Sequence, residues 1–114
     1  MSNFVILPSP DYTSELIRLV PEFASSDELK LLDRELRTMP VLSFAAFGLF
    51  FENQPPQSAI SLACAQALEE LSSRQDPDIE DLLVTGTFEA FQSPHETAVR
   101  LHPRSREIFD RWMT

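Results

Sequence analysis

Apolar residues recur every three or four positions along most of this chain of 114 residues, which is the spacing of amphipathic α-helices. The pattern predicts the following helices: a short one after Pro10 that ends or kinks at Pro21, one over residues 29–39 that stops at Pro40, one over about residues 57–74, one after Pro77 and one after Pro103. The helix after Pro77 carries apolar residues on two sides. That distribution is typical of a helix at the centre of a fold.

Residues 41–51 read Val-Leu-Ser-Phe-Ala-Ala-Phe-Gly-Leu-Phe-Phe and suit either a helix or a strand. The alanines and the lack of a partner strand favour a helix. Residues 1–9 are expected to form an extended N-terminal arm. Because a chain of this length buries roughly two-thirds of its surface on folding, it can build one core but not two. We therefore predict one domain over residues 1–114, an all-α compact bundle of about six or seven helices arranged as irregular helical hairpins.

Prolines and capping residues mark the predicted helix starts, since the chain has nine prolines and only two glycines. Three prolines follow a residue whose side-chain oxygen can cap a helix, at Ser9-Pro10, Asp76-Pro77 and Ser93-Pro94. Ser25 with Glu28 and Ser93 with Glu96 have the spacing of capping boxes. Gly86 lies inside a predicted helix, where glycine costs about 1 kcal/mol relative to alanine. We expect it to permit close helix packing.

The composition excludes several classes of function. The net charge is −9, with one lysine and eight arginines, which disfavours binding to duplex nucleic acid. The single cysteine, Cys64, cannot form an internal disulfide. The N-terminus lacks the basic region and long apolar run of a signal peptide, and no run approaches the roughly 18 apolar residues of a membrane span. These features predict a soluble cytoplasmic protein that does not bind a membrane.

The residues with possible catalytic or metal-binding chemistry are few. His95 and His102 lie about two helical turns apart without a third ligand at metal-binding spacing, so we interpret them as cap and turn residues. Cys64 has small apolar neighbours, which predicts a buried core residue rather than a nucleophile. Glu52 and Glu89 could be partly buried acids with raised pKa values, but a surface glutamate or an acid paired with an arginine is the preferred interpretation. We predict no enzyme activity, no metal and no cofactor.

Negative charge is concentrated in residues 69–96, where eight acids face Arg74 alone and leave a charge of −7. Residues 97–114 carry net +2. On the helix after Pro77, polar residues spaced by three or four form one edge, with the preceding helix end expected beside it: Asp78, Asp81, Thr85, Glu89 and Gln92, flanked by Glu69 and Glu70. Such an edge is either a solvated face that keeps the protein soluble or a docking surface for a basic protein. The candidate partner-binding residues are Glu69, Glu70, Asp78, Asp81 and Glu89.

Four segments resemble a family of small bacterial all-helical proteins of the toxin-immunity type: Leu19-Val20-Pro21-Glu22-Phe23, Phe47-Gly48-Leu49-Phe50-Phe51-Glu52, Leu82-Leu83-Val84-Thr85-Gly86-Thr87-Phe88-Glu89-Ala90-Phe91 and Leu101-His102-Pro103-Arg104-Ser105-Arg106. The resemblance covers about residues 16–112 and transfers no active-site residue. It implies an all-α fold and a protein that neutralises a cognate toxin, whose basic domain would be the partner.

Two other functions stay open at this point. A small helical adaptor or regulator would bind another cellular protein, and could form a homodimer through exposed aromatics such as Phe50, Phe51 or Trp112. An enzyme or metal protein would use Glu52 or Glu89 with a histidine, and we rank it last. The sequence leaves open whether the protein is a monomer or a homodimer.

Overall fold

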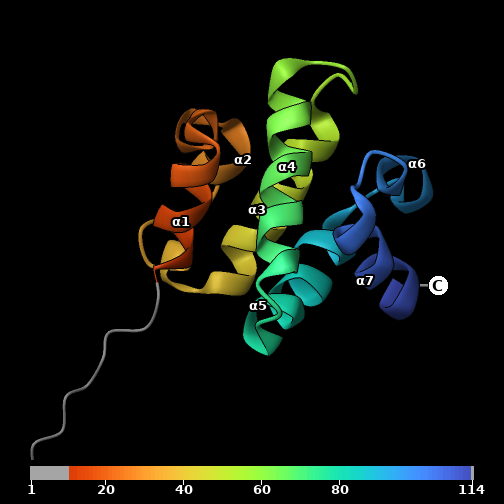
Figure 1. The fold of residues 1–114 in the computed structure, drawn as a ribbon. Coiled ribbons are helices and arrows are strands. Elements are labelled where there is room, and N and C mark those ends of the chain that lie inside the picture. Colours follow the sequence, from red (N-terminus) through yellow and green to blue (C-terminus); the bar gives the residue numbers. More distant parts are fainter. Residues whose placement is uncertain (1–10, 114) are drawn as a thin grey trace, which may run out of the picture.

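Helices account for all the regular secondary structure of residues 11–113, the part of the chain that the computed structural model describes (Figure 1). In chain order they are α1 (Tyr12–Leu19), η1 (Pro21–Ser25), α2 (Asp27–Lys30), η2 (Leu36–Thr38), α3 (Pro40–Asn53), α4 (Ala59–Ser73), α5 (Pro77–Leu82), η3 (Leu83–Phe88), α6 (Pro94–Ala98) and α7 (Pro103–Met113). Segments η1 and η2 are 3₁₀-helices, and η3 is a π-helix that continues α5. The all-α prediction is confirmed. The predicted arm over residues 1–9 and the Ser9 cap lie outside the described residues.

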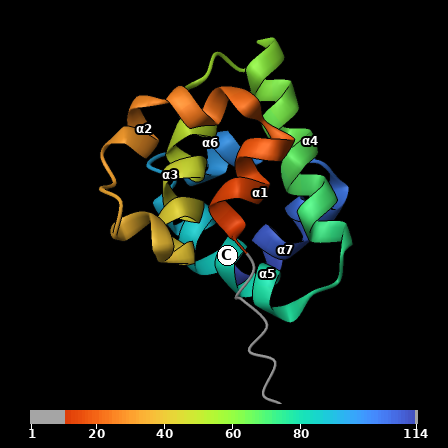
Figure 2. The same ribbon diagram turned by 90° about the vertical axis from the view of Figure 1, so that its left-hand side faces the viewer.

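The two longest helices, α3 and α4, form the middle of the bundle. Figure 1 shows α1 and α2 on one side of them and the C-terminal helices on the other, and Figure 2 shows α1 in front of α3 from the N-terminal side. Helix α1 contacts both α3 and α4, while α7 contacts α4 and η3. The segment 41–51, which could have been a strand, lies within α3.

Aromatic rings connect the two sides of the bundle through its core. Phe23 of η1 meets Phe47 of α3 with ring centroids 5.1 Å apart, and Phe88 of η3 meets Phe109 of α7 at 5.6 Å. The fully buried phenylalanines come from η1, α3, η3 and α7: Phe23, Phe44, Phe47, Phe51, Phe88 and Phe109. Each such ring buries a large apolar area, so these residues supply much of the driving force for folding.

Helix α3 and segment η3 cross at very short range because each contributes a glycine to the contact. A Cβ added at Gly48 would lie 2.4 Å from the backbone oxygen of Thr87, and one added at Gly86 would lie 2.7 Å from the Cβ of Phe44. The Thr87 hydroxyl donates to the Phe44 carbonyl at 2.8 Å across the same contact. The expectations of close packing at Gly86 and of a central position for this helix are both confirmed.

The helix predicted over residues 29–39 is wrong, because the structure breaks this stretch into α2 and η2. The carboxylate of Asp33 accepts from the Leu36 N–H at 2.9 Å and starts a new turn. The Arg37 guanidinium donates to the carbonyls of Leu29 and Leu32, which satisfies groups that a continuous helix would pair internally. Leu36 and Met39 of the predicted apolar stripe are 37% and 48% exposed, so the core does not hold the stripe in a single helix.

The proline that was expected to end this helix instead begins the next one. Pro40 occupies the first turn of α3, where the missing N–H of proline is not needed. Asp76 caps α5 as predicted, accepting from the Asp78 N–H at 2.9 Å. The two capping boxes are wrong: Ser26 rather than Ser25 caps α2, and the Ser93 side chain makes no capping hydrogen bond.

Two of the aromatic residues expected on the surface lie in the core. Phe50 is 5% exposed and Phe51 is fully buried, because both faces of α3 are covered by other helices. The homodimer contact suggested for these two residues is therefore wrong. Trp112, in contrast, is 57% exposed.

Candidate protein-binding surface

The outer side of α5 and η3 carries three acids, Asp78, Asp81 and Glu89, which we call the acidic edge. All three are exposed, and no described residue makes a hydrogen bond or ion pair with their carboxylates. The opposite side of the same helix, including Ile79 and Leu83, is buried in the core. The apolar face therefore fixes the helix in the bundle and leaves the acids directed to solvent.

The negative charge at the start of α5 acts on the neighbouring helix α1. Burial raises the pKa of Tyr12, and the charges of Asp76 and Asp78 raise it further. Tyr12 itself packs edge-on against Phe44, with ring centroids 5.8 Å apart. The negative potential thus extends from the acidic edge to the N-terminal end of α1.

Glu69, another candidate binding residue, is engaged within the protein. Its carboxylate accepts from the backbone N–H groups of Arg104 and Ser105 at 3.1 and 3.0 Å, and from the Ser105 hydroxyl at 3.2 Å. Partial burial would raise the pKa of Glu69, but these hydrogen bonds outweigh it and the pKa is lowered. Glu69 of α4 therefore caps the start of α7, which positions that helix against α4.

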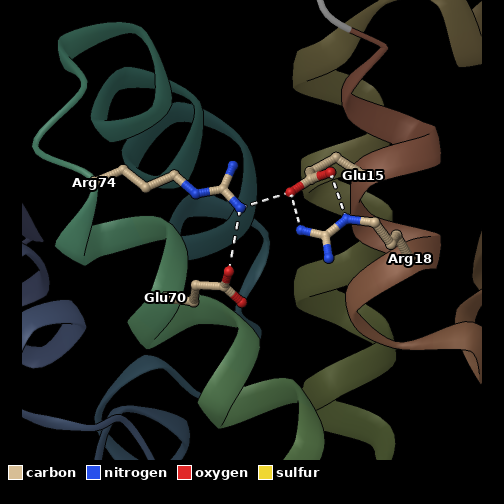
Figure 3. Close-up of polar contacts among 4 residues, drawn as sticks. All are labelled: Glu15, Arg18, Glu70 and Arg74. Carbon is tan, nitrogen blue, oxygen red and sulfur yellow. Dashed lines mark hydrogen bonds and ion pairs between the residues drawn. The ribbon is translucent and has the colours of Figure 1, made fainter.

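Glu70 takes part in a network of ion pairs that joins α4 to α1 (Figure 3). Arg74 lies 2.6 Å from Glu15 and 3.4 Å from Glu70, and Glu15 also pairs with Arg18 at 2.6 Å. Hydrogen bonds from Arg18 and Arg74 lower the pKa of Glu15 to about 2. The structure consequently leaves Asp78, Asp81 and Glu89 exposed, holds Glu69 at the start of α7, and pairs the exposed Glu70 with Arg74 at the end of its own helix.

Glu52 makes a second cap of this kind, which the sequence pattern did not indicate. Its carboxylate accepts from the N–H groups of Gln92 and Ser93 at 2.8 and 3.0 Å and from the Thr97 hydroxyl at 2.5 Å. Burial alone would raise the pKa of Glu52, but these bonds and the charge of Arg100 lower it. The raised pKa considered as an alternative for Glu52 is wrong, because α6 begins against the C-terminal end of α3.

The remaining reactive side chains form no site in the described residues. Cys64 is fully buried in α4, and burial raises the pKa of its thiol to about 12. The prediction of a core cysteine is confirmed. Within residues 11–113, no three residues among the histidines, cysteine and acids lie close enough together to hold a metal ion. In the same residues, no helix has the length and apolar character needed to span a membrane.

Comparisons with known proteins return no relative: the sequence matches no family model, and no curated protein or solved structure is similar to it. The resemblance to toxin-immunity proteins consequently rests on the four quoted segments alone. The function has to be argued from the surface chemistry.

Proposed function

We propose that this chain is a non-catalytic protein-binding protein of the immunity type, which neutralises a cognate bacterial toxin by covering a basic surface of the toxin. The acidic edge is the surface that would make the contact. The observation that carries this proposal is that Asp78, Asp81 and Glu89 are all exposed on a helical segment whose apolar side is locked into the core.

The use of other acids in the same region supports this assignment. Glu69 caps α7, Glu70 pairs with Arg74, and Asp76 caps α5. These contacts explain the presence of those acids by the needs of the fold. Asp78 lies in the first turn of α5, where an acid suits the helix dipole, but none of the three carboxylates of the acidic edge is bonded within the described residues, so their charge is available to a partner.

A rigid acidic surface suits an inhibitor of a basic effector. Complementary charges accelerate association, and a bound acidic helix would mask the lysines and arginines with which such an effector binds phosphate. Because the helix is fixed on α3 through the glycine contact, little ordering is needed when the partner binds.

The test uses the product of the gene next to this one, produced in a bacterial host with and without the chain. We expect growth inhibition without the chain, protection with it, and a complex that weakens as salt is raised. Changing Asp78→Lys, Asp81→Lys and Glu89→Lys together should abolish protection. Protection that survives this triple reversal would contradict the proposed surface, and a harmless neighbouring product would contradict the proposed function.

A matched control distinguishes local charge from net charge. The triple variant Glu22→Lys, Glu35→Lys and Glu96→Lys makes the same change in charge at exposed acids outside the acidic edge. It should retain protection. Circular dichroism and thermal unfolding of both triple variants would show whether each is folded.

An adaptor or regulator is the second candidate, and the 57% exposure of Trp112 is the observation that favours it. Such a protein would bind a cellular protein other than a toxin, or a second copy of itself. Sedimentation equilibrium separates these cases, since a homodimer would double the mass at micromolar concentration. A monomer that protects against the neighbouring product would exclude the adaptor function.

A further inference from the structure

An exposed tryptophan lies beside the acidic edge and forms one wall of a small groove. The groove has a volume of about 190 Å³ and is lined by residues of α5, η3 and α7: Pro77, Glu80, Asp81, Val84 and Trp112. With about 30 Å³ for each water in the liquid, it has room for about six waters. That is the scale of one long side chain rather than of a folded element.

The walls of this groove combine two kinds of surface. Val84 and the half-exposed indole of Trp112 are apolar, whereas Asp81 and Glu80 are acids at its rim. An aromatic face attracts a cation through the negative charge of its π system, most strongly when the ring is that of tryptophan. Guanidinium groups both stack on such rings and pair with carboxylates, so an arginine matches both surfaces at once.

The charged residues next to the groove leave Trp112 and Asp81 available to an arginine. Arg111 precedes Trp112 on α7 and lies 3.4 Å from Glu80 and 3.1 Å from Glu107. Its side chain is 51% exposed, and exposed ion pairs of this kind contribute little. The Asp81 carboxylate makes no hydrogen bond or ion pair within the described residues, so it is available to an incoming cation.

We propose that this groove receives an arginine side chain of the partner protein, with the guanidinium stacked on Trp112 and paired with Asp81. The inference rests on the proposed function, because Asp81 belongs to both the groove and the acidic edge. It specifies the partner as a protein that presents an arginine on an exposed, basic segment. Tryptophan and arginine are also the residues that most often dominate binding at interfaces.

The experiment uses Trp112 as its own reporter, because it is the only tryptophan of the chain. An acetylated and amidated peptide of alternating glycine and arginine is titrated into the protein at low salt. We expect the Trp112 emission to change and saturate, and the effect to disappear with added salt. A matched peptide with citrulline in place of arginine keeps the shape but loses the charge and has a carbonyl oxygen in place of one amino group, and should not bind.

Variants locate the binding. Anisotropy of a dye-labelled arginine peptide should show affinity lowered about three- to tenfold by Trp112→Leu or by Asp81→Asn. Glu35→Gln removes the same charge from an exposed acid elsewhere and should leave the affinity unchanged. Because Asp81 is exposed, Asp81→Asn remains a valid test even if Trp112→Leu fails to fold.

Three results would overturn the inference: no change in Trp112 emission with the arginine peptide, equal binding of the citrulline peptide, or an emission that depends on protein concentration because a second copy fills the groove. Failure of the proposed function is a separate result. If the acidic-edge reversal abolishes protection but Trp112→Leu preserves it, the arginine groove is wrong and the proposed function stands. If neither variant affects protection, the acidic edge is not the contact surface, whereas the proposed function is wrong only if the natural chain gives no protection or the neighbouring product is harmless.

Discussion

Acids at the ends of α3 and α4 and acids along α5 and η3 have opposite roles in this molecule. Glu52 and Glu69 each accept three hydrogen bonds from a distant helix start. The carboxylates of Asp78, Asp81 and Glu89 accept none from the described residues. The first group substitutes for local capping residues, while the second contributes only its charge to the surface.

Acidic residues that are close together in the sequence can therefore have different roles in the structure. Residues 69–96 look like a uniform block of charge, yet the fold assigns Glu69 to the start of α7 and leaves Asp81 free. A capping acid accepts from backbone N–H groups, and removal of the acid would leave those N–H groups without their acceptor. An edge acid can change sign without breaking any contact of the folded chain. Changes to the capping acids should therefore affect stability, and changes to the edge acids should affect binding.

The largest effect on stability is expected at the contact that holds the acidic edge in place. Gly48→Ala would place a Cβ 2.4 Å from the Thr87 carbonyl oxygen, which belongs to the backbone and cannot turn away. We expect unfolding free energy to fall by about 3 kcal/mol, the upper part of the range for overpacked cores. Urea unfolding of the variant and of the natural chain measures this loss. Helix propensity alone would predict a gain of about 1 kcal/mol, so a stabilised variant would contradict the structure.

Removal of a capping acid should come next in size. Glu52→Ala would leave the N–H groups of Gln92 and Ser93 and the hydroxyl of Thr97 without their acceptor. We expect a loss of about 1–3 kcal/mol, together with faster hydrogen exchange in α6. If α6 retained its protection, the assignment of Glu52 as its cap would be wrong.

Acid should weaken the fold through the same group of acids together with Glu15. The pKa of Glu15 is lowered to about 2, from 4.5, by its bonds to Arg18 and Arg74. A depressed pKa stabilises the folded state above pH 4.5 and loses that contribution as the pH falls toward 2. Urea midpoints at about pH 7 and about pH 3 should differ less in Glu15→Gln than in the natural chain. An unchanged difference would contradict the role of this network.

The smallest effect on stability is expected at the acidic edge itself. Asp81→Asn and Glu89→Gln should each change the unfolding free energy by no more than about 0.5 kcal/mol, because no contact is lost. Their effect should appear in partner binding and in its dependence on salt. A loss of stability equal to that of Glu52→Ala would remove the distinction between capping and edge acids.

Much of the fold could be predicted from local patterns. A proline that follows a capping residue located the starts of α5 and α6, and the three-to-four spacing of apolar residues located α4 and the helix after Pro77. The failures share a cause. Residues 29–39 have the apolar spacing of a helix, but Leu36 and Met39 are left exposed and the Arg37 guanidinium donates to the carbonyls that the helix would have used. Tertiary contacts outweighed the local preference.

For the same reason, only part of the candidate site could be predicted from the sequence. The periodicity after Pro77 correctly located the exposed edge, because one helix carries both the buried and the acidic side. It could not show that Glu69 turns toward α7, since that depends on a contact between residues 36 positions apart. Nor could it place Trp112 beside Val84 and Asp81, which lie on a different helix.

What the sequence by itself determined is the helical class, the length of most helices and the presence of an acidic side on α5 and η3. These depend on neighbours within one or two turns. Only the tertiary structure decided which acids cap other helices, which aromatics are buried and where an apolar wall meets free charge. Those outcomes depend on which distant surfaces pack together, because a hydrogen-bond donor needs a nearby acceptor and an aromatic ring needs apolar neighbours, and both can come from any part of the chain.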